Sequence, residues 1–474
     1  MKASALESQV RLPPEPDSGF DAAALVAGLR TFFRSGTTAD IGWRRRQLEQ
    51  LRSMLSENEA RFLDALAQDL HKAPQEGYMT EISGLYEDIA HTLKYLKKWV
   101  RPRRVPTPLI AQPAKSYTLP EPLGVVLIIG AWNYPLQLLL SPLVPAIAAG
   151  NCAVLKPSEL APATSRLVAE LLPRYLDGDA FICVEGAVPE TTALLEQRWD
   201  HIFYTGGGQV GRIVMAAAAK HLTPVTLELG GKSPCIVADD ANIALAARRI
   251  AWGKFLNAGQ TCIAPDYLLC SKTTADRLLP EIEKSVRAMF GDDPRKSPDY
   301  GRIVNSRHAH RLASYLSDGE VVFGGQVDAD ARYVAPTLLR NVGVESAVMQ
   351  EEIFGPVLPV VELNDISEAE AFVNEREKPL ALYVFTQSDA TADHLLARCS
   401  SGNACVNDCV MFMANSALPF GGVGASGMGA YHGEHGFRTF SHFKAVMKRR
   451  NIFDLSIRYA PFSAWKFKLL RLLR

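Results

Sequence analysis

The spacing of apolar residues divides the chain into a helical opening segment and a long stretch of alternating strands and helices. Over residues 22–99 the apolar positions recur at helical spacing, as in Leu48, Leu51 and Leu55. Between residues 123 and 231, short apolar runs instead alternate with helical patterns. The expected strands are 125–129, 152–155, 181–184, 201–204 and 225–229, and the expected helices include 163–172 and 210–219. This alternation predicts a parallel sheet covered by helices on both faces.

The alternation continues over residues 232–420, with helices expected at 244–255 and 275–289, and predicts a second α/β domain. Residues 1–20 are rich in proline and acidic residues, and we expect them to form a loose arm. Residues 122–155 carry no charge and are long enough to cross a bilayer. Pro135, Pro142 and Pro145 argue against a continuous spanning helix, so we expect a strand, a loop, an apolar helix and a second strand there.

Composition narrows the class of protein. Lysine plus arginine and aspartate plus glutamate both total 51, so the net charge gives no reason to expect a nucleic-acid partner. The eight cysteines are scattered and form no CxxC pair, which indicates reduced thiols in the cytoplasm. The ten histidines contain no HExxH pair, and Cys405 and Cys409 have no partnering pair, so we expect no metal site. The N-terminal residues lack the apolar core of a signal peptide.

A glycine-rich turn follows the strand expected at 201–204. Gly206, Gly208 and Gly211 satisfy the GxGxxG pattern between a strand and a helix. Such a turn brings backbone amides and a helix N-terminus close to a pyrophosphate, so it predicts a dinucleotide site. Glu228 closes the next strand, near the place where this pattern puts a ribose-binding acid. Position alone leaves two roles open for Glu228, a ribose ligand or a general base.

Cys262, in the run Asn-Ala-Gly-Gln-Thr-Cys, is the candidate nucleophile. A thiol attacks only as the thiolate, so it needs a polarising setting or a base nearby. Glu228, in Thr-Leu-Glu-Leu-Gly-Gly, offers a carboxylate, and Asn133, in Asn-Tyr-Pro, offers an amide for an oxyanion. Each residue also has a purely structural alternative. Cys262 could be a buried thiol, Glu228 a solvated residue at the end of a strand, and Asn133 a turn residue. The sequence does not show whether the three meet in space.

The ordered motifs resemble those of the aldehyde dehydrogenase superfamily from about residue 25 to 458. The chain is most similar to the class 3 and fatty aldehyde dehydrogenase branch, with coniferyl aldehyde dehydrogenases also close. The shared strings are residues 121–126, 220–234, 350–359 and 418–424. The resemblance implies an α/β, aldehyde dehydrogenase-like fold with a Rossmann-type cofactor domain, an α/β catalytic domain and a small bridging β element.

The same resemblance implies domain boundaries and an assembly. The NAD(P)-binding domain would comprise residues 1–107 and 122–229, and the catalytic domain residues 230–431. Residues 108–121 and 432–452 would form the bridging and oligomerisation element of a homodimer. Residues 453–474 would be an amphipathic tail.

For the chemistry, the resemblance implies that Cys262 is the nucleophile and that Glu228 activates water. The Asn133 amide and the Cys262 backbone N–H would bind the oxyanion. The cofactor would be NAD or NADP, and its expected contacts are Lys156, Glu159, Gly206, Gly207, Gly211, Glu352 and Phe354. In this family only the outer glycines of the turn, Gly206 and Gly211, are usually required. Relatives usually carry serine at the position of Gly207, which leaves the preference between NAD and NADP open.

The expected substrate is a small-molecule aldehyde, in a pocket lined by Tyr134, Phe412 and Phe420. Phe412 and its two neighbouring methionines offer flexible apolar lining, which favours a hydrophobic aliphatic or aromatic aldehyde; core packing is the alternative. Two other functions stay open. A CoA-acylating dehydrogenase would release the thioester to CoA, and Glu228 counts against it. A non-catalytic binding protein is opposed by the joint presence of Cys262, Glu228 and Asn133.

The tail interleaves apolar residues with four cations over residues 459–474, a pattern typical of an interfacial helix. Three interpretations stay open: peripheral membrane contact, packing against a dimer partner near its substrate entrance, and a frayed end. The expected location is therefore cytoplasmic or membrane-peripheral.

Overall fold

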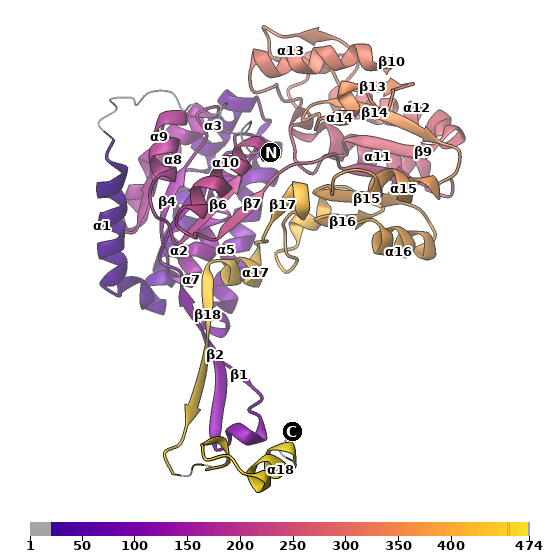
Figure 1. Cartoon of the computed structure of the whole chain (residues 1–474). Coiled ribbons are helices and arrows are strands. Elements are labelled where there is room, and N and C mark those ends of the chain that lie inside the picture. The colour runs from indigo at the N-terminus through magenta and orange to yellow at the C-terminus, as the bar shows by residue number, and fades with distance from the viewer. Residues whose placement is uncertain (1–19, 453, 455, 473–474) are drawn as a thin grey trace, which may run out of the picture.

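The computed structural model describes residues 20–452, 454 and 456–472 (Figure 1). The loose arm expected at residues 1–20 lies outside the described residues except for Phe20. The helical opening segment forms α1 (Ala22–Arg34), α2 (Ile41–Glu57), α3 (Glu59–Leu70), α4 (Pro74–Gly77) and α5 (Ser83–Trp99). Leu48, Leu51 and Leu55 are fully buried, as their spacing predicts, and they join a core shared with the first sheet.

The first sheet has six strands in the order β17-β7-β6-β3-β4-β5. Its strands are β3 (Val125–Ile129), β4 (Cys152–Lys156), β5 (Phe181–Cys183), β6 (His201–Thr205), β7 (Val225–Glu228) and β17 (Gly427–Met428). β3 to β7 pair in parallel, whereas the short β17 pairs antiparallel with β7. The crossover helices are α6 (Gln137–Leu140), α7 (Leu143–Ala149), α8 (Pro162–Tyr175), α9 (Val188–Leu195) and α10 (Gly208–Ala219). The predicted parallel sheet is confirmed, with strand ends shifted by at most one residue.

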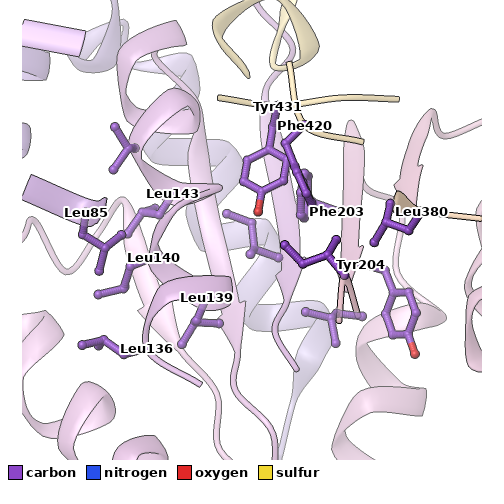
Figure 2. Close-up of a cluster of buried hydrophobic side chains, with 14 of the residues drawn as sticks. Leu85, Leu136, Leu139, Leu140, Leu143, Phe203, Tyr204, Leu380, Phe420 and Tyr431 are labelled. Atoms are coloured by element: carbon purple, nitrogen blue, oxygen red, sulfur yellow. The ribbon is translucent and has the colours of Figure 1, made fainter. Parts of the chain in front are cut away.

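The uncharged stretch at residues 122–155 folds back on itself. It contains β3, the two short helices α6 and α7, and β4. Figure 2 shows leucines of α6 and α7 gathered beside Leu85 of α5, all in one buried cluster. Among the described residues, no helix is both long enough and apolar enough to cross a membrane. The stretch is uncharged because it is buried inside the protein.

The second sheet has seven strands in the order β10-β13-β14-β9-β8-β15-β16. They are β8 (Pro234–Val237), β9 (Tyr267–Ser271), β10 (Glu320–Phe323), β13 (Thr337–Arg340), β14 (Val357–Leu363), β15 (Ala381–Phe385) and β16 (Asn403–Val406). Its helices are α11 (Ile243–Phe255), α12 (Lys272–Phe290), α13 (Ser306–Ser314), α14 (Ala347–Gln350), α15 (Glu368–Asn374) and α16 (Asp389–Arg398). A two-stranded pair, β11 (Val327–Asp328) and β12 (Tyr333–Val334), lies apart from it. The second α/β unit expected over 232–420 is present.

A third sheet extends from the body as an arm (Figure 1). It joins β1 (Arg103–Val105), β2 (Ala114–Pro122) and β18 (Ser441–Arg449) in antiparallel pairing. The helix α17 (Gly433–Thr439) leads into β18, and α18 (Ala464–Leu472) lies near the far end of the arm. The arm therefore pairs two segments that are far apart in the sequence.

Aromatic packing fixes the segment before α17 against the first sheet. The Tyr431 ring meets that of Phe203, on β6, edge to face with centroids 5.0 Å apart. Phe420 and Tyr431 form an isolated β-bridge, and their ring centroids lie 5.8 Å apart. Figure 2 shows these three rings together in the core. Residues 420–431 are thereby held near the carboxyl end of the sheet, where β6 and β7 end at Thr205 and Glu228.

Candidate functional site

Two cavities meet between the first and second sheets. The larger, of about 500 Å³, is lined by the carboxyl ends of β3, β4, β6 and β7. The smaller, of about 300 Å³, is lined by α5, α11 and residues 410–420. Cys262 and Glu228 line both cavities, so they lie on the wall that the two share. Ligand sites in such sheets lie at the carboxyl ends of the strands, which makes this wall the candidate site.

The loop before Cys262 has an unusual backbone. Asn257 and Ala258 both have φ of 52°, and Gly259 has φ of 75°. Left-handed backbone at a non-glycine residue costs of order 1–3 kcal/mol and persists only where the surroundings enforce it. A Cβ on Gly259 would lie 2.2 Å from the Gly355 carbonyl oxygen, so only glycine fits there. This shape therefore requires strong support from neighbouring groups.

Amide side chains provide that support. Asn257 Nδ2 donates to the Asn133 carbonyl at 2.8 Å, and Gln260 Nε2 donates to the Asn257 carbonyl at 3.0 Å. Gln260 Oε1 accepts from the Val304 N–H at 2.9 Å. Asn257 and Gln260 are fully buried. The residue pattern did not predict roles for them, although two amide side chains in the Cys262 motif were a visible signal.

Cys262 lies in surroundings that oppose ionisation. Burial raises the pKa of its thiol above the ordinary value, and the nearby carboxylates of Glu352 and Glu228 raise it further. The backbone N–H groups of Cys262 and Ile263 act in the opposite direction, because they can donate to the sulfur. Formation of the thiolate therefore requires a proton acceptor at the site.

Glu228 is the last residue of β7 and is 3% exposed. Neither of its carboxylate oxygens has a hydrogen-bond partner among the described residues, and the same holds for the nearby hydroxyls of Thr205 and Tyr431. Burial raises the pKa of Glu228 well above its ordinary value. Buried polar groups rarely stay unpaired, so this cluster of oxygens points to a bound water or ligand.

Asn133 follows β3 and is 2% exposed. Its Nδ2 donates one hydrogen bond to the Gln260 carbonyl at 3.0 Å, which leaves a second N–H on the same nitrogen. Asn133, Cys262 and Glu228 all line the larger cavity. The structure thus brings the three candidate residues together.

Of the seven expected cofactor contacts, six line the larger cavity: Lys156, Glu159, Gly206, Gly207, Glu352 and Phe354. Gly211 does not. It lies inside α10 against Leu229, and a Cβ there would come 2.9 Å from the leucine side chain. Gly206 has φ of 159°, and a Cβ would lie 2.3 Å from the Tyr204 hydroxyl, whereas a Cβ at Gly208 meets only the end of Arg212. The outer glycines are thus the sterically required ones.

Backbone groups already hold two ionisable residues of this cavity. Lys156 Nζ donates to the carbonyls of Pro157 at 2.8 Å and Gly186 at 2.6 Å, and burial lowers the pKa of the lysine. Glu352 lies against Gly230, so close that a Cβ on that glycine would clash with its carboxylate. Burial raises the pKa of Glu352 to about 8. Both side chains are oriented before any ligand arrives.

The residue pattern did not predict an apolar slot in the same cavity. Val188 on α9 is 59% exposed, and Val210 and Ile213 on α10 are 42% and 45% exposed. All three line the cavity beside the glycine turn. Exposed aliphatic side chains on facing helices make a surface suited to a flat aromatic base. Only the tertiary packing of α9 and α10 reveals it, because the sequence does not show which helix faces are covered.

The smaller cavity is mainly apolar. Tyr134 and Phe420 line it as expected, together with Met411 and Met413. Phe412 is not among the lining residues; its ring stacks between those of Tyr383 and Phe420, at 6.2 Å from each. Further lining residues that the pattern did not predict are Met79, Trp252, Leu256, Leu380 and His432.

Comparison with known proteins identifies the family. The model of the aldehyde dehydrogenase family matches residues 20–446. The mouse (Mus musculus) aldehyde dehydrogenase family 3 member A2 is 51% identical over 417 residues, 88% of this chain and 86% of that protein. The dog (Canis lupus familiaris) dimeric NADP-preferring aldehyde dehydrogenase is 47% identical over 439 residues, 92% of this chain and 97% of that protein. The solved substrate-bound state of Staphylococcus aureus AldH has a TM-score of 0.93 at 44% identity, covering 96% of this chain and 99% of that one.

These matches extend over both α/β units, so the likeness covers the two cavities as well as the fold. They confirm the resemblance found in the motifs and the expected fold class. The chain belongs to the aldehyde dehydrogenase family, in its class 3 and fatty aldehyde dehydrogenase-like branch, and is an NAD(P)-dependent aldehyde dehydrogenase.

Proposed function

We propose that the chain oxidises a hydrophobic aldehyde to the carboxylic acid through a thioester on Cys262, which water then hydrolyses. One observation carries the proposal: Cys262 and Glu228 lie on the wall shared by a largely apolar cavity and a larger cavity with a glycine turn. An aldehyde in the first cavity and a dinucleotide in the second would meet at this sulfur.

The larger cavity fits NAD or NADP. The open space over Gly207, the exposed N-terminus of α10 and the apolar slot of Val188, Val210 and Ile213 suit a pyrophosphate and an adenine ring. Lys156 and Glu159 would hold the adenosine ribose, Glu352 the nicotinamide ribose, and Phe354 would pack beside the nicotinamide. When bound, the cofactor supplies a hydride acceptor.

The residues of the chain carry out the remaining steps. The Cys262 thiolate adds to the aldehyde carbon, and the carbonyl oxygen becomes an oxyanion held by the Asn133 amide and the Cys262 N–H. Loss of a hydride from that carbon leaves an acyl group on the sulfur. Glu228, deprotonated, takes a proton from water; the resulting hydroxide attacks the thioester, and the thiolate leaves with the carboxylic acid as product. We infer that Glu228 also accepts the thiol proton at the start and releases it to solvent before hydrolysis, so that the carboxylate is free to take the proton from water.

Replacing Asn133 with alanine is expected to lower kcat by about 10²–10³-fold, because the oxyanion loses one of its two donors. The dissociation constant of the cofactor should stay near that of the unmodified enzyme, because the oxyanion forms only after the aldehyde has reacted. Stopped-flow recording of reduced nicotinamide, with cofactor titration by fluorescence, measures both. An undiminished kcat would remove Asn133 from the mechanism.

The substrate class follows from the smaller cavity. Its lining is mostly apolar, with three flexible methionines and the ring of Phe420, so an aliphatic or aromatic aldehyde without charge fits it. The decisive assay measures turnover of medium-chain, long-chain and coniferyl-type aldehydes with NAD⁺ and NADP⁺ in turn. The product is then identified in the presence of CoA. Free carboxylic acid is expected. Acyl-CoA with little free acid would establish the CoA-acylating alternative, and no reduced nicotinamide at all would favour a non-catalytic protein.

We further propose that the first sheet with its helices is the cofactor domain, the second the catalytic domain, and the β1-β2-β18 arm the bridge of a homodimer. The named dimeric relative in dog supports the assembly. The eight free thiols support a cytoplasmic location. Phe462, Trp465, Phe467 and Leu472, at the end of the arm, are all more than half exposed, so we propose that they pack against the dimer partner or a membrane surface.

Deleting residues 460–474 is expected to remove this apolar surface without disturbing either cavity. Packing on a dimer partner predicts a lower oligomeric mass or slower turnover of long-chain aldehydes. Membrane contact predicts loss of binding to anionic vesicles. Light scattering, long-chain kinetics and vesicle sedimentation separate the two, and unchanged values in all three would leave only a frayed end.

A further inference from the structure

An ion pair lies buried behind the Asn133 loop. Lys72, which follows α3, and Glu81, in a single π-helical turn before α5, form a direct ion pair, and both side chains are fully buried. Neither residue lines either cavity. Two buried charges lose their hydration, so their mutual attraction needs further hydrogen bonds to offset that loss. The partners in those hydrogen bonds therefore indicate the role of the ion pair.

The other hydrogen bonds of the two side chains all reach residues 133–137. Lys72 Nζ donates to the Asn133 carbonyl at 2.9 Å and lies 4.0 Å from the centre of the Tyr134 ring. Glu81 Oε2 accepts from the N–H groups of Leu136 at 3.0 Å and Gln137 at 3.1 Å, at the start of α6. The pair thus holds both ends of the turn that carries the Asn133 side chain.

The same carbonyl joins the turn to the nucleophile loop. The Asn133 oxygen also accepts from Asn257 Nδ2 at 2.8 Å, and Asn133 Nδ2 donates to the Gln260 carbonyl at 3.0 Å. The Tyr134 hydroxyl lies 2.5 Å from the Thr261 hydroxyl, next to Cys262. The charge of Lys72 is therefore two hydrogen bonds away from the loop that ends in the reactive sulfur.

We propose that Lys72 and Glu81 are positioning residues, which fix the distance between the Asn133 amide and the Cys262 sulfur; this rests on the oxyanion role proposed above for Asn133. The pair touches neither substrate nor cofactor. It acts by holding the backbone of residues 133–137 against the loop at 257–262. A small displacement of the amide weakens its bond to the oxyanion, which forms only during turnover.

The test separates positioning from simple stability. Lys72→Met and Glu81→Gln singly leave one buried charge unpaired, so both are expected to lower Tm and kcat. The double variant Lys72→Met/Glu81→Gln removes both charges and is expected to regain much of the lost Tm. Its kcat should stay about 10–100-fold low. Its aldehyde KM and cofactor dissociation constant should stay within about threefold. Recovery of kcat together with Tm would overturn the positioning role.

A control away from the site is the partly exposed ion pair of Arg30 and Asp200, 2.8 Å long, beside the amino end of β3. Arg30→Met/Asp200→Asn is expected to lower Tm and leave kcat within about twofold. A fall in its kcat as large as that of the Lys72/Glu81 double variant would show that lost stability alone slows the enzyme, against the proposal.

A cycle with Asn133→Ala completes the test. If the pair acts through Asn133, adding Glu81→Gln, the isosteric change, to Asn133→Ala should lower kcat no further, while Glu81→Gln alone lowers it. If the losses of kcat in Asn133→Ala and Glu81→Gln multiply in the combined variant, the two residues act independently. That result would overturn the inference and leave the proposed function standing. A normal kcat in Asn133→Ala alone would instead refute the proposed oxyanion role. This cycle uses Glu81→Gln and does not need Lys72→Met. It therefore still tests the proposal if the variant Lys72→Met/Glu81→Gln does not fold.

Discussion

Replacing Cys262 with serine is expected to lower kcat by at least about 10⁴-fold, the largest effect of any single change in this chain. An alcohol ionises far less readily than a thiol, so in a site whose burial already opposes ionisation it remains neutral. The altered side chain is smaller but otherwise similar, and the loop at 257–262 keeps its amide contacts. Cofactor binding and Tm should therefore change little, as fluorescence titration and calorimetry would show.

Cys405→Ser is the matched control. Cys405 is half-buried like Cys262 but lies on β16 and lines neither cavity. Its activity should equal that of the unmodified enzyme. A Cys262→Ser variant that kept more than about a tenth of the normal kcat would contradict covalent catalysis by this residue.

Replacing Glu228 with glutamine is expected to lower steady-state kcat by about 10²–10⁴-fold, because an amide cannot take a proton from water. The first turnover should still release one equivalent of reduced nicotinamide per site, because hydrolysis comes after that step. Its rate should fall, because Glu228 also accepts the thiol proton. Rapid mixing resolves the burst from the slow phase. Glu87→Gln, an exposed carboxylate on the smaller cavity, is the control and should behave normally. An undiminished steady state, or a missing burst, would contradict the assignment.

Glu228 also sets a pH dependence. Burial raises its pKa well above the ordinary value, so the carboxyl keeps its proton to higher pH than an exposed glutamate does. Only the deprotonated form can act as a base, so kcat should rise with pH from neutral into the alkaline range. In Glu228→Gln this rise in the hydrolytic step should disappear, whereas Glu87→Gln should keep it. A flat profile in the unmodified enzyme would show that the protonation of Glu228 does not limit turnover.

Much of the fold could be predicted because its periodicities are strong. β3 to β7 are short apolar runs between helices of regular spacing, and both faces of their sheet are covered. The family motifs also predicted Cys262, Glu228 and Asn133 as the candidate catalytic residues. Each motif is a short continuous segment of sequence. Each places one side chain at the end of a strand or in a turn, beside the same cavity wall.

The lining of the smaller cavity and the buried ion pair could not be predicted, because both depend on tertiary packing. Phe412 lies in a short 3₁₀ turn that follows Val410, whose φ is 66°, so alternation could not show that Met411 and Met413 face the cavity while Phe412 turns away. Lys72 and Glu81 look like solvated charges in a helical pattern, and only the packing of that region against the turn at 133–137 buries them.

The most direct test of the covalent mechanism is the mass of the Cys262 peptide after Glu228→Gln is mixed with a hydrophobic aldehyde and NAD(P)⁺ and quenched in acid. This peptide is expected to carry the acyl group of the aldehyde, bound as a thioester that hydroxylamine removes. Reduced nicotinamide formed in the burst with every cysteine peptide unmodified would contradict it.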